Sequence, residues 1–152
     1  MEEEIKEMKK FLGFVGVLVL GWTNLGFCAA VTVTGTTTVF TTIQAGVNAC
    51  PVGGTVSVSA GIYTEAVYVN KGIALIGAGS NSTTITASGL GYKSTVTFNG
   101  SGANNSLISG FRITGATGGL YYGNGIYCAS SSPSITNNTI SGNGYNGISC
   151  DA

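Results

Sequence analysis

Few side chains in this chain of 152 residues are suited to chemistry. Histidine is absent, and beyond residue 30 the only charged residues are Glu65, Lys71, Lys93, Arg112 and Asp151. The commonest general base and the commonest neutral metal ligand are therefore missing. The remaining candidates are tyrosine rings, which can stack on other rings or on sugars, and cysteine thiols, which can bond to each other or to a metal.

Four tyrosines gather near one long turn and form the candidate glycan-contact surface. They are Tyr121, Tyr122, Tyr127 and Tyr145. Aromatic rings beside polar Asn and Ser side chains are typical of surfaces that bind sugars, because such rings offer a flat apolar face next to hydrogen-bonding groups. The same rings can also simply cover their own turn, so the sequence leaves both interpretations open.

Two cysteines occupy equivalent positions of an internal repeat. The segment 124–128, Asn-Gly-Ile-Tyr-Cys, returns 22 residues later as Asn-Gly-Ile-Ser-Cys at 146–150. A disulfide between Cys128 and Cys150 is conceivable in an exported protein, but parallel in-register side chains hold their Cβ atoms too far apart. We expect these two thiols and Cys50 to be buried small hydrophobes, and we expect no metal site and no cofactor.

The charged side chains and two neighbouring asparagines are expected to be structural. Glu65 and Lys71 flank a short strand and are predicted to be solvated at its corners, while Arg112 lies between two apolar neighbours and is predicted to face outward. Asn137 and Asn138 are predicted at a corner of the chain, because Asn tolerates a left-handed backbone and forms hydrogen bonds along a stack. No catalytic residue is expected from this set.

The 22-residue repeat predicts the elements that hold these residues. A fixed period of this size is typical of stacked coils, in which each repeat buries its apolar face against its neighbours. Equivalent residues of successive coils then lie ~4.8 Å apart, which predicts Ile113 on Ile140, Ile126 on Ile148 and Cys128 on Cys150. The predicted core is Val56, Val58, Val67, Val69, Leu75, Ile85, Val96, Phe98, Ile113, Ile126, Ile135, Ile140 and Ile148.

One short helix is expected before the coils. Val31 to Phe40 alternates Val with Thr and is predicted as a first strand. Ile43, Val47 and Cys50 then share one helical face, Thr41 or Thr42 is a suitable N-cap, and Pro51 ends the helix. Because two turns of helix are unstable alone, this helix is predicted to cover the N-terminal end of the stack.

Several segments resemble a known family. Thr42-Ile43-Gln44-Ala45, Gly61-Ile62-Tyr63-Thr64-Glu65, Ile73-Ala74-Leu75-Ile76-Gly77 and Ser134-Ile135-Thr136-Asn137-Asn138-Thr139-Ile140 resemble the right-handed parallel β-helix proteins of the pectin-lyase-like superfamily, including NosD-like periplasmic proteins. The resemblance implies an all-β, single-stranded right-handed parallel β-helix solenoid of about five coils with a short N-terminal capping helix. The aspartate clusters of the family's lyases and esterases have no counterpart, so no catalytic role is carried over.

The first thirty residues are predicted to be a secretory signal. Met8-Lys9-Lys10 precedes an apolar run from Phe11 to Trp22 and a small-residue site at Ala29-Ala30. We therefore expect domains at 1–30 (signal peptide, with a true start possible at Met8) and 31–152 (β-helix, truncated at its C-terminal end). No membrane span is expected after cleavage, since the run is shorter than the ~20 residues that a span needs.

These observations predict an exported protein that is secreted, periplasmic or bound at the cell surface. The net charge is zero, so nucleic acid is not an expected partner, whereas a polysaccharide or cell-surface glycan is. End-to-end contact through an uncapped last coil is a further expectation. The predicted function is a non-catalytic glycan-binding or scaffold module. The alternatives are the N-terminal part of a polysaccharide lyase or hydrolase and a NosD-like maturation factor.

Overall fold

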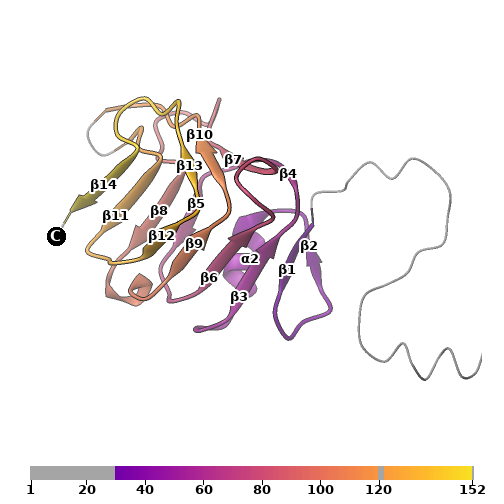
Figure 1. Cartoon of the computed structure of the whole chain (residues 1–152). Coiled ribbons are helices and arrows are strands. Elements are labelled where there is room, and N and C mark those ends of the chain that lie inside the picture. Colours follow the sequence, from indigo (N-terminus) through magenta and orange to yellow (C-terminus); the bar gives the residue numbers. More distant parts are fainter. Residues whose placement is uncertain (1–29, 120–121, 152) are drawn as a thin grey trace, which may run out of the picture.

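The chain folds into a stack of short parallel strands that forms three sheets (Figure 1). The structure is a computed structural model that describes residues 30–119 and 122–151. Sheet A contains, in spatial order, β12 (Ser134–Thr136), β9 (Leu107–Ser109), β6 (Ala74–Gly77), β3 (Thr55–Val58), β1 (Val31–Val33) and β2 (Val39–Phe40). Sheet B contains β13 (Thr139–Ile140), β10 (Arg112–Thr114), β7 (Thr83–Thr86) and β4 (Gly61–Thr64). Sheet C contains β14 (Ile148–Asp151), β11 (Ile126–Ala129), β8 (Val96–Asn99) and β5 (Val67–Val69).

Each coil takes one strand from each sheet, in the order A, B, C. The strands β3, β4 and β5 make the first coil, and β12, β13 and β14 make the last of the four coils in the described residues. This arrangement confirms the predicted all-β parallel β-helix, with four coils in place of about five. The predicted stacking is also confirmed, because Ile113 pairs with Ile140, Ile126 with Ile148 and Cys128 with Cys150.

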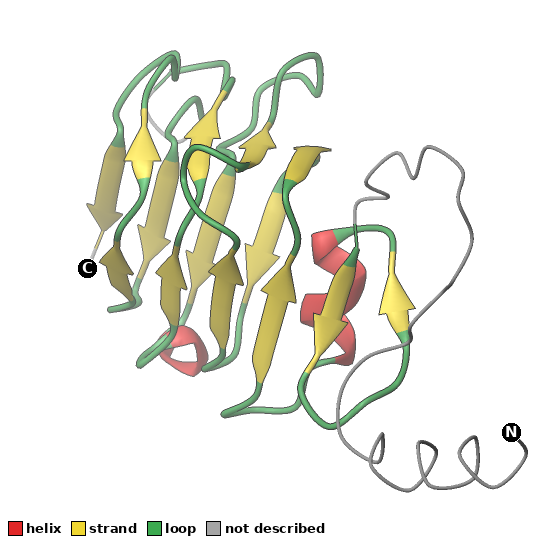
Figure 2. Ribbon diagram, turned by 45° about the vertical axis from the view of Figure 1, so that its right-hand side comes forward, coloured by secondary structure: helices red, strands yellow, loops and turns green. Residues whose placement is uncertain are grey.

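The N-terminal end of the stack departs from the coil pattern. The segment predicted as one strand forms β1 and β2, which pair antiparallel with each other, and β1 also pairs antiparallel with β3. The helix α2 (Ile43–Ala49) then lies across this end of the stack (Figure 2). Thr42 is its N-cap, since Thr42 Oγ1 accepts a hydrogen bond from the backbone N–H of Ala45 at 3.2 Å. The predicted capping helix is therefore confirmed.

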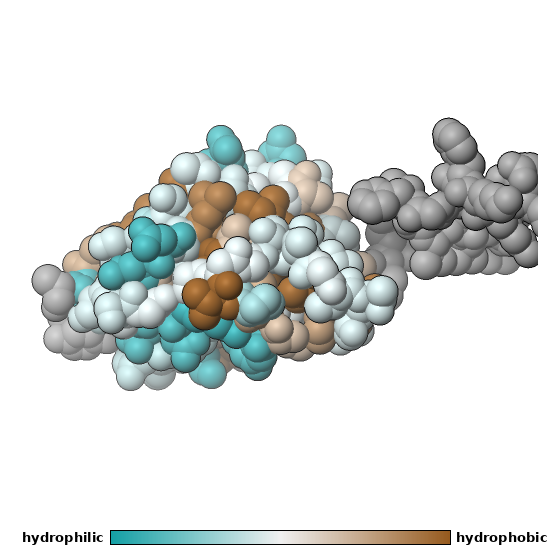
Figure 3. Space-filling model, turned by 90° about the horizontal axis from the view of Figure 1, so that it is seen from below, coloured by the Kyte–Doolittle hydropathy of each residue, from teal (hydrophilic) through white to brown (hydrophobic). Residues whose placement is uncertain are grey.

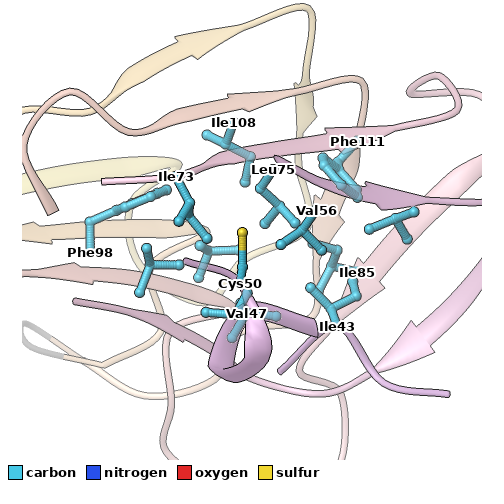
Figure 4. Packing of buried hydrophobic residues seen from close by; sticks show 14 of the residues in the cluster. Ile43, Val47, Cys50, Val56, Ile73, Leu75, Ile85, Phe98, Ile108 and Phe111 are labelled. Atoms are coloured by element: carbon cyan, nitrogen blue, oxygen red, sulfur yellow. The ribbon is translucent and has the colours of Figure 1, made fainter. Parts of the chain in front are cut away.

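The core runs through the interior of the coils and continues under the helix. Ile43, Val47 and Cys50 are buried and pack on strand residues such as Val56 and Leu75 (Figure 4). Strand residues alternate between buried and exposed, as in β5, where Val67 and Val69 are buried and Tyr68 is not. Burial of these apolar side chains, each worth ~1.5–3 kcal/mol, is the main stabilising contribution.

The predicted core is wrong at its C-terminal end. Ile148 is 45% exposed, and Ile135 and Ile140 are only partly buried. The physical reason is the position of their strands: β12, β13 and β14 each have a strand neighbour on one side only among the described residues. A side chain in such a strand packs against one coil, whereas Ile126 packs between two and is fully buried.

The face of the molecule in Figure 3 is mostly polar and carries separate apolar patches. Viewed from below the orientation of Figure 1, it is mostly pale or teal, with separate brown patches (Figure 3). Large exposed hydrophobic side chains such as Val52, Ile62 and Tyr92 lie in different parts of the chain.

A short 3-10 helix, η1 (Ser101–Ala103), connects sheets C and A. Within residues 30–119 and 122–151, no helix has the length and apolarity that crossing a membrane requires.

Candidate functional site

The outward face of sheet C carries a column of aromatic and hydroxyl side chains. The register of the parallel strands places Tyr68, Thr97, Tyr127 and Ser149 on successive coils. Successive strands lie ~4.8 Å apart, so the backbones of Tyr68 and Tyr127 are about 10 Å apart with Thr97 between them. The strand alternation that buries Val67, Val96 and Ile126 turns these residues outward. The column thus presents two rings separated by one small polar residue.

An open groove of about 380 Å³ lies over this column. Its lining residues are Ala66, Val67, Tyr68, Lys93, Ser94, Thr97, Tyr122 and Tyr127. The volume falls at the lower end of the range of ~300–1,000 Å³ found for small-molecule sites. Tyrosine rings, a cation and hydroxyl groups therefore meet in one concave surface.

Two long turns between sheets B and C form one wall of the groove. The turn 87–95 carries Lys93, and the turn 115–125 carries Tyr122. The turns are joined by a hydrogen bond from the backbone N–H of Lys93 to the carbonyl of Thr117, at 3.1 Å. This contact brings residues far apart in the sequence to the same edge of sheet C.

Two glycines allow the second turn to place Tyr122. Gly118 and Gly123 have φ angles of 121° and 84°, in the region that L side chains rarely adopt. A Cβ on Gly118 would approach the Cβ of Tyr122 to 2.8 Å and Cδ1 of Tyr92 to 3.0 Å, and one on Gly123 would collide with the carbonyl of Gly118. A side chain at either position would therefore displace the turn and, with it, the ring of Tyr122.

One buried hydroxyl that lines the groove lacks a hydrogen-bond partner. Ser94 is 5% exposed, and its Oγ has no partner among the described residues. On the next coil Asn124 is fully buried; its Oδ1 accepts from the backbone N–H of Asn146 at 3.4 Å, while its Nδ2 is unpaired. The backbone bond from Thr95 N–H to the Asn124 carbonyl places the two residues at the same corner. An unpaired buried polar group costs ~1–3 kcal/mol, so these two atoms make an unfavourable contribution to the stability of this corner.

The structure places two of the four tyrosines of the predicted glycan-contact surface in the same groove. Tyr122 and Tyr127 line the groove, and Tyr145 is 48% exposed in the next turn, where its N–H donates to the carbonyl of Gly123. Tyr121 lies outside the described residues. Sequence reasoning missed Tyr68 and Lys93. The alternation Val67-Tyr68-Val69 was the available signal for Tyr68, since it matches Ile126-Tyr127-Cys128.

The hydroxyl of Tyr127 also forms a hydrogen bond between two neighbouring coils. It donates to Oδ2 of Asp151 at 2.6 Å, across to the neighbouring strand β14. A short hydrogen bond to an ionised carboxylate is strong, so it restricts the position of the Tyr127 ring in the groove.

The stacked cysteines are free thiols that differ in exposure. Cys50 and Cys128 are buried thiols, as predicted, but Cys150 is exposed, so the prediction is wrong there; the cause is again the one-sided packing of β14. Burial, together with the neighbouring thiol of Cys150, raises the pKa of Cys128 to about 12. Burial also raises the pKa of Cys50, partly offset by the charge of Lys71. In the described ranges no three His, Cys, Asp or Glu residues converge as a metal site would need.

Glu65 and Lys71 are not solvated corner residues, and this prediction is wrong. The carboxylate of Glu65 accepts the backbone N–H of Ile43 at 2.8 Å and that of Gln44 at 2.9 Å. The ammonium of Lys71 donates to the carbonyls of Asn48 and Cys50, at 3.0 and 2.7 Å. Both side chains hold the ends of α2, so neither is a candidate for acid–base chemistry. Arg112 is exposed, as predicted.

The prediction that an asparagine side chain forms hydrogen bonds along the stack is confirmed for Asn138. Asn138 Oδ1 accepts from the N–H of Phe111 at 2.9 Å, and its Nδ2 donates to the carbonyl of Ile108 at 2.9 Å. Asn137 has the left-handed backbone, with φ of 54°. Asn143 repeats the arrangement one turn later, with its side chain bonded to Ala116 N–H and the Ile113 carbonyl. These side chains replace backbone bonds where the strands end.

The fold and the groove define a parallel β-helix with an aromatic-lined surface on one sheet. The chain belongs to the family described as "Protein of unknown function (DUF1565)", whose profile matches residues 68–152. A curated relative, the "Cell surface glycoprotein" of Methanothermus fervidus, is 35% identical over 136 residues, which cover 88% of this chain and 21% of the relative. The chain thus spans about a fifth of that relative's length. No solved structure matches the chain significantly.

Proposed function

We propose that this chain is part of an exported, non-catalytic β-helix module at the cell surface, and that the groove over sheet C binds carbohydrate. The family match and the likeness to a protein described as a cell surface glycoprotein support the surface location. In this proposal residues 1–30 are a cleaved signal, residues 31–152 are the β-helix, and the fold is of the pectin-lyase-like kind.

The groove is the observation that carries the proposal. A pyranose ring has a flat C–H face, which an aromatic ring covers well, and an edge of hydroxyl groups, which needs hydrogen-bond partners. Tyr68 and Tyr127 offer rings from strands whose backbones are about 10 Å apart, and Thr97 offers a hydroxyl group between them.

The charges around the groove favour binding over cleavage. Its one charged lining residue is Lys93, and no carboxylate belongs to the described lining. Glycosidases generally use two carboxyl groups that flank the scissile bond. Two carboxylates lie near the lining residues: Asp151 accepts the hydroxyl of Tyr127, and both oxygens of Glu65, which precedes Ala66, accept hydrogen bonds from α2. Lyase, hydrolase and NosD-like maturation activities therefore rank behind carbohydrate binding.

A pull-down and titration experiment tests the proposal. The purified chain is mixed with a panel of insoluble and soluble polysaccharides, and the bound fraction is measured with the wild type, Tyr68→Ala and Tyr127→Ala. We expect retention of the wild type on at least one glycan, loss of retention in both variants, and no release of reducing ends or unsaturated sugars. Retention that is equal in all three proteins, or no retention on any glycan, would contradict the binding role. Failure on every glycan would favour a purely structural scaffold.

A further inference from the structure

We propose that the partner of the groove is the flat surface of an insoluble polysaccharide, in which sugar chains lie side by side, and not one isolated chain. This inference rests on the proposed carbohydrate binding and names the form of carbohydrate that fits. A second row of tyrosines, along the edge of the groove, carries it. The row consists of Tyr92, Tyr122 and Tyr145, and we call it the tyrosine ridge.

The exposed aromatic side chains gather at one edge of the molecule. Within the described residues, the exposed aromatic side chains are Tyr68, Tyr92, Tyr122 and Tyr145. The first lies on the outward face of sheet C, and the other three lie in turns between sheets B and C. Exposed aliphatic side chains do not follow this pattern, since Ile62, for example, lies on sheet B. A local concentration of exposed rings is typical of an interaction surface, whereas single apolar side chains on a surface are common.

The ridge is formed by three successive turns between sheets B and C, which are residues 87–95, 115–125 and 141–147. The middle turn is bonded to both of its neighbours. The backbone N–H of Lys93 donates to the carbonyl of Thr117 at 3.1 Å, and the N–H of Tyr145 donates to the carbonyl of Gly123 at 2.9 Å. The three turns are therefore stacked in the same way as the coils to which they belong.

A glycine in the middle turn brings two side chains of the ridge together. A Cβ on Gly118 would lie 3.0 Å from Cδ1 of Tyr92 and 2.8 Å from the Cβ of Tyr122. Both side chains therefore pack over the same point of the backbone. Tyr92 also pairs with Thr117 in an isolated parallel bridge. Backbone contacts thus hold the ridge, while its three tyrosines remain 48% to 77% exposed.

The ridge and the outward column of sheet C run in the same direction. In the column, Tyr68 and Tyr127 lie on β5 and β11, with β8 between them (Figure 1). Each turn of the ridge leads into one strand of the same sheet, so both rows follow the axis along which the coils stack, with a step of ~4.8 Å per coil. Tyr122 belongs to both, because it also lines the groove.

Two parallel rows of rings fit neighbouring chains of an aligned polysaccharide. Sugars that are linked through equatorial bonds form a flat ribbon whose faces carry C–H groups, and such ribbons pack side by side into sheets. Aromatic faces cover C–H faces well, and the hydroxyl of tyrosine allows its ring to stay in water before binding. One row then contacts one chain and the second row contacts its neighbour, so the two contacts reinforce each other. A dissolved chain occupies one row only.

The test compares insoluble and dissolved forms of the same sugars. Cellulose and chitin powders are the insoluble probes, and soluble hexasaccharides of both polymers are the dissolved probes. Powder retention and hexasaccharide titration are measured for the wild type, for Tyr92→Ala combined with Tyr145→Ala, and for Tyr127→Ala. We expect the ridge double variant to lose about tenfold in retention on at least one powder, as for side chains that contribute strongly at an interface, with nearly unchanged hexasaccharide affinity. Tyr127→Ala should weaken both.

Matched variants separate the rings from other effects. Tyr92→Phe combined with Tyr145→Phe keeps both rings and should be retained like the wild type. Ile62→Ala removes an exposed side chain from sheet B and should also leave retention unchanged. Circular dichroism checks that each protein folds. Tyr145→Ala alone is the second variant if loss of the Tyr92 contact at Gly118 unfolds the turns.

Four results would overturn the inference: no retention of the wild type on either powder, equal retention of the wild type and the ridge double variant, equal losses on powder and hexasaccharide, or a change in molar mass in ultracentrifugation. The last would make the ridge a contact between protein copies. Binding of another, soluble polysaccharide in any of these cases would leave the proposed carbohydrate binding in place, whereas failure on every glycan would remove both proposals.

Discussion

The helical cap at the N-terminal end and the groove over sheet C use their charged side chains in opposite ways. In the cap, Glu65 accepts two N–H groups at the start of α2, and Lys71 donates to two carbonyls at its end. In the groove, no hydrogen bond among the described residues uses the ammonium of Lys93. The charges of the cap are engaged in the fold, whereas the charge of the groove makes no hydrogen bond to the described residues.

The difference follows from what each region must achieve. A helix of seven residues is too short to be stable alone, and its first N–H groups and last carbonyls have no partners within it. A carboxylate at the first turn and an ammonium at the last turn satisfy these groups and oppose the helix dipole. The strands of the sheets do not need charged side chains in this way, because hydrogen bonds between neighbouring parallel strands pair their backbone N–H and C=O groups. The ammonium of Lys93, beside sheet C, is therefore not required to satisfy backbone groups.

The largest predicted effect is on the cap. Glu65→Gln keeps the size of the side chain but replaces one accepting oxygen with an NH₂ group that faces a backbone N–H. We expect the free energy of unfolding to fall by ~1.5–3 kcal/mol, the range for hydrogen bonds to a charged group. Urea unfolding followed by circular dichroism measures it.

Thiol labelling shows where Glu65→Gln acts. Cys50 lies buried under the end of α2, and Cys128 lies buried behind sheet C. Burial raises the pKa of both thiols, so each reacts mainly when its region opens. The substitution should speed the modification of Cys50 and leave that of Cys128 nearly unchanged. Equal acceleration of both would mean that the cap and the coils open together.

The second effect is on the groove. Tyr127→Ala removes one ring from the outward column. We expect this to weaken retention on the bound polysaccharide about tenfold, or ~1.4 kcal/mol, a loss typical of side chains that contribute strongly to binding at an interface. Tyr127→Phe is the matched control, since it keeps the ring and removes only the hydroxyl that donates to Asp151. Isothermal titration with a soluble fragment of the polysaccharide measures both. Similar losses in the two variants would assign the effect to the hydroxyl and not to stacking.

The sequence predicted the coils well because their information is local and repeated. The 22-residue period fixed the stacking of Ile126 on Ile148, and the spacing of Ile43, Val47 and Cys50 fixed the helix. The apolar pattern is the same whether a coil has one neighbour or two, so it did not reveal that Ile148 is half exposed.

The roles of the charged residues depended on contacts that no local pattern shows. Glu65 and Lys71 reach α2 across 21 to 23 residues, and only the way the helix lies across the stack brings them together. Only some of the lining residues of the groove were predicted, because others come together through contacts between segments far apart in the sequence. Tyr122 and Tyr127 are close in sequence, whereas Lys93 reaches the groove through the pairing of two long turns.

The two lysines offer a matched pair for the third prediction. Lys71→Met should lower the free energy of unfolding by about 1 kcal/mol, because two helix carbonyls lose a charged donor. Lys93→Met should change it by less than ~0.5 kcal/mol, as for most surface substitutions, and should instead reduce polysaccharide retention. Thermal unfolding and retention, measured on both variants, compare them. A reversal of the two stability changes would contradict the division of roles between cap and groove.

The smallest predicted effect concerns the residue that joins the two regions. Gln44, on α2, accepts the backbone N–H of Tyr68 at 2.7 Å and donates to its carbonyl at 3.1 Å, so the helix fixes the strand residue that carries one ring of the groove. Gln44→Ala should cost ~0.5–1 kcal/mol of stability, reduced a little by the higher helix propensity of alanine. It should also weaken retention two- to threefold, since Tyr68 is held less firmly. Asn48→Ala is the control, because it removes a partner of Gln44 and leaves both bonds to Tyr68 in place. Unchanged retention in Gln44→Ala would show that cap and groove are independent, and that the strand register alone positions Tyr68.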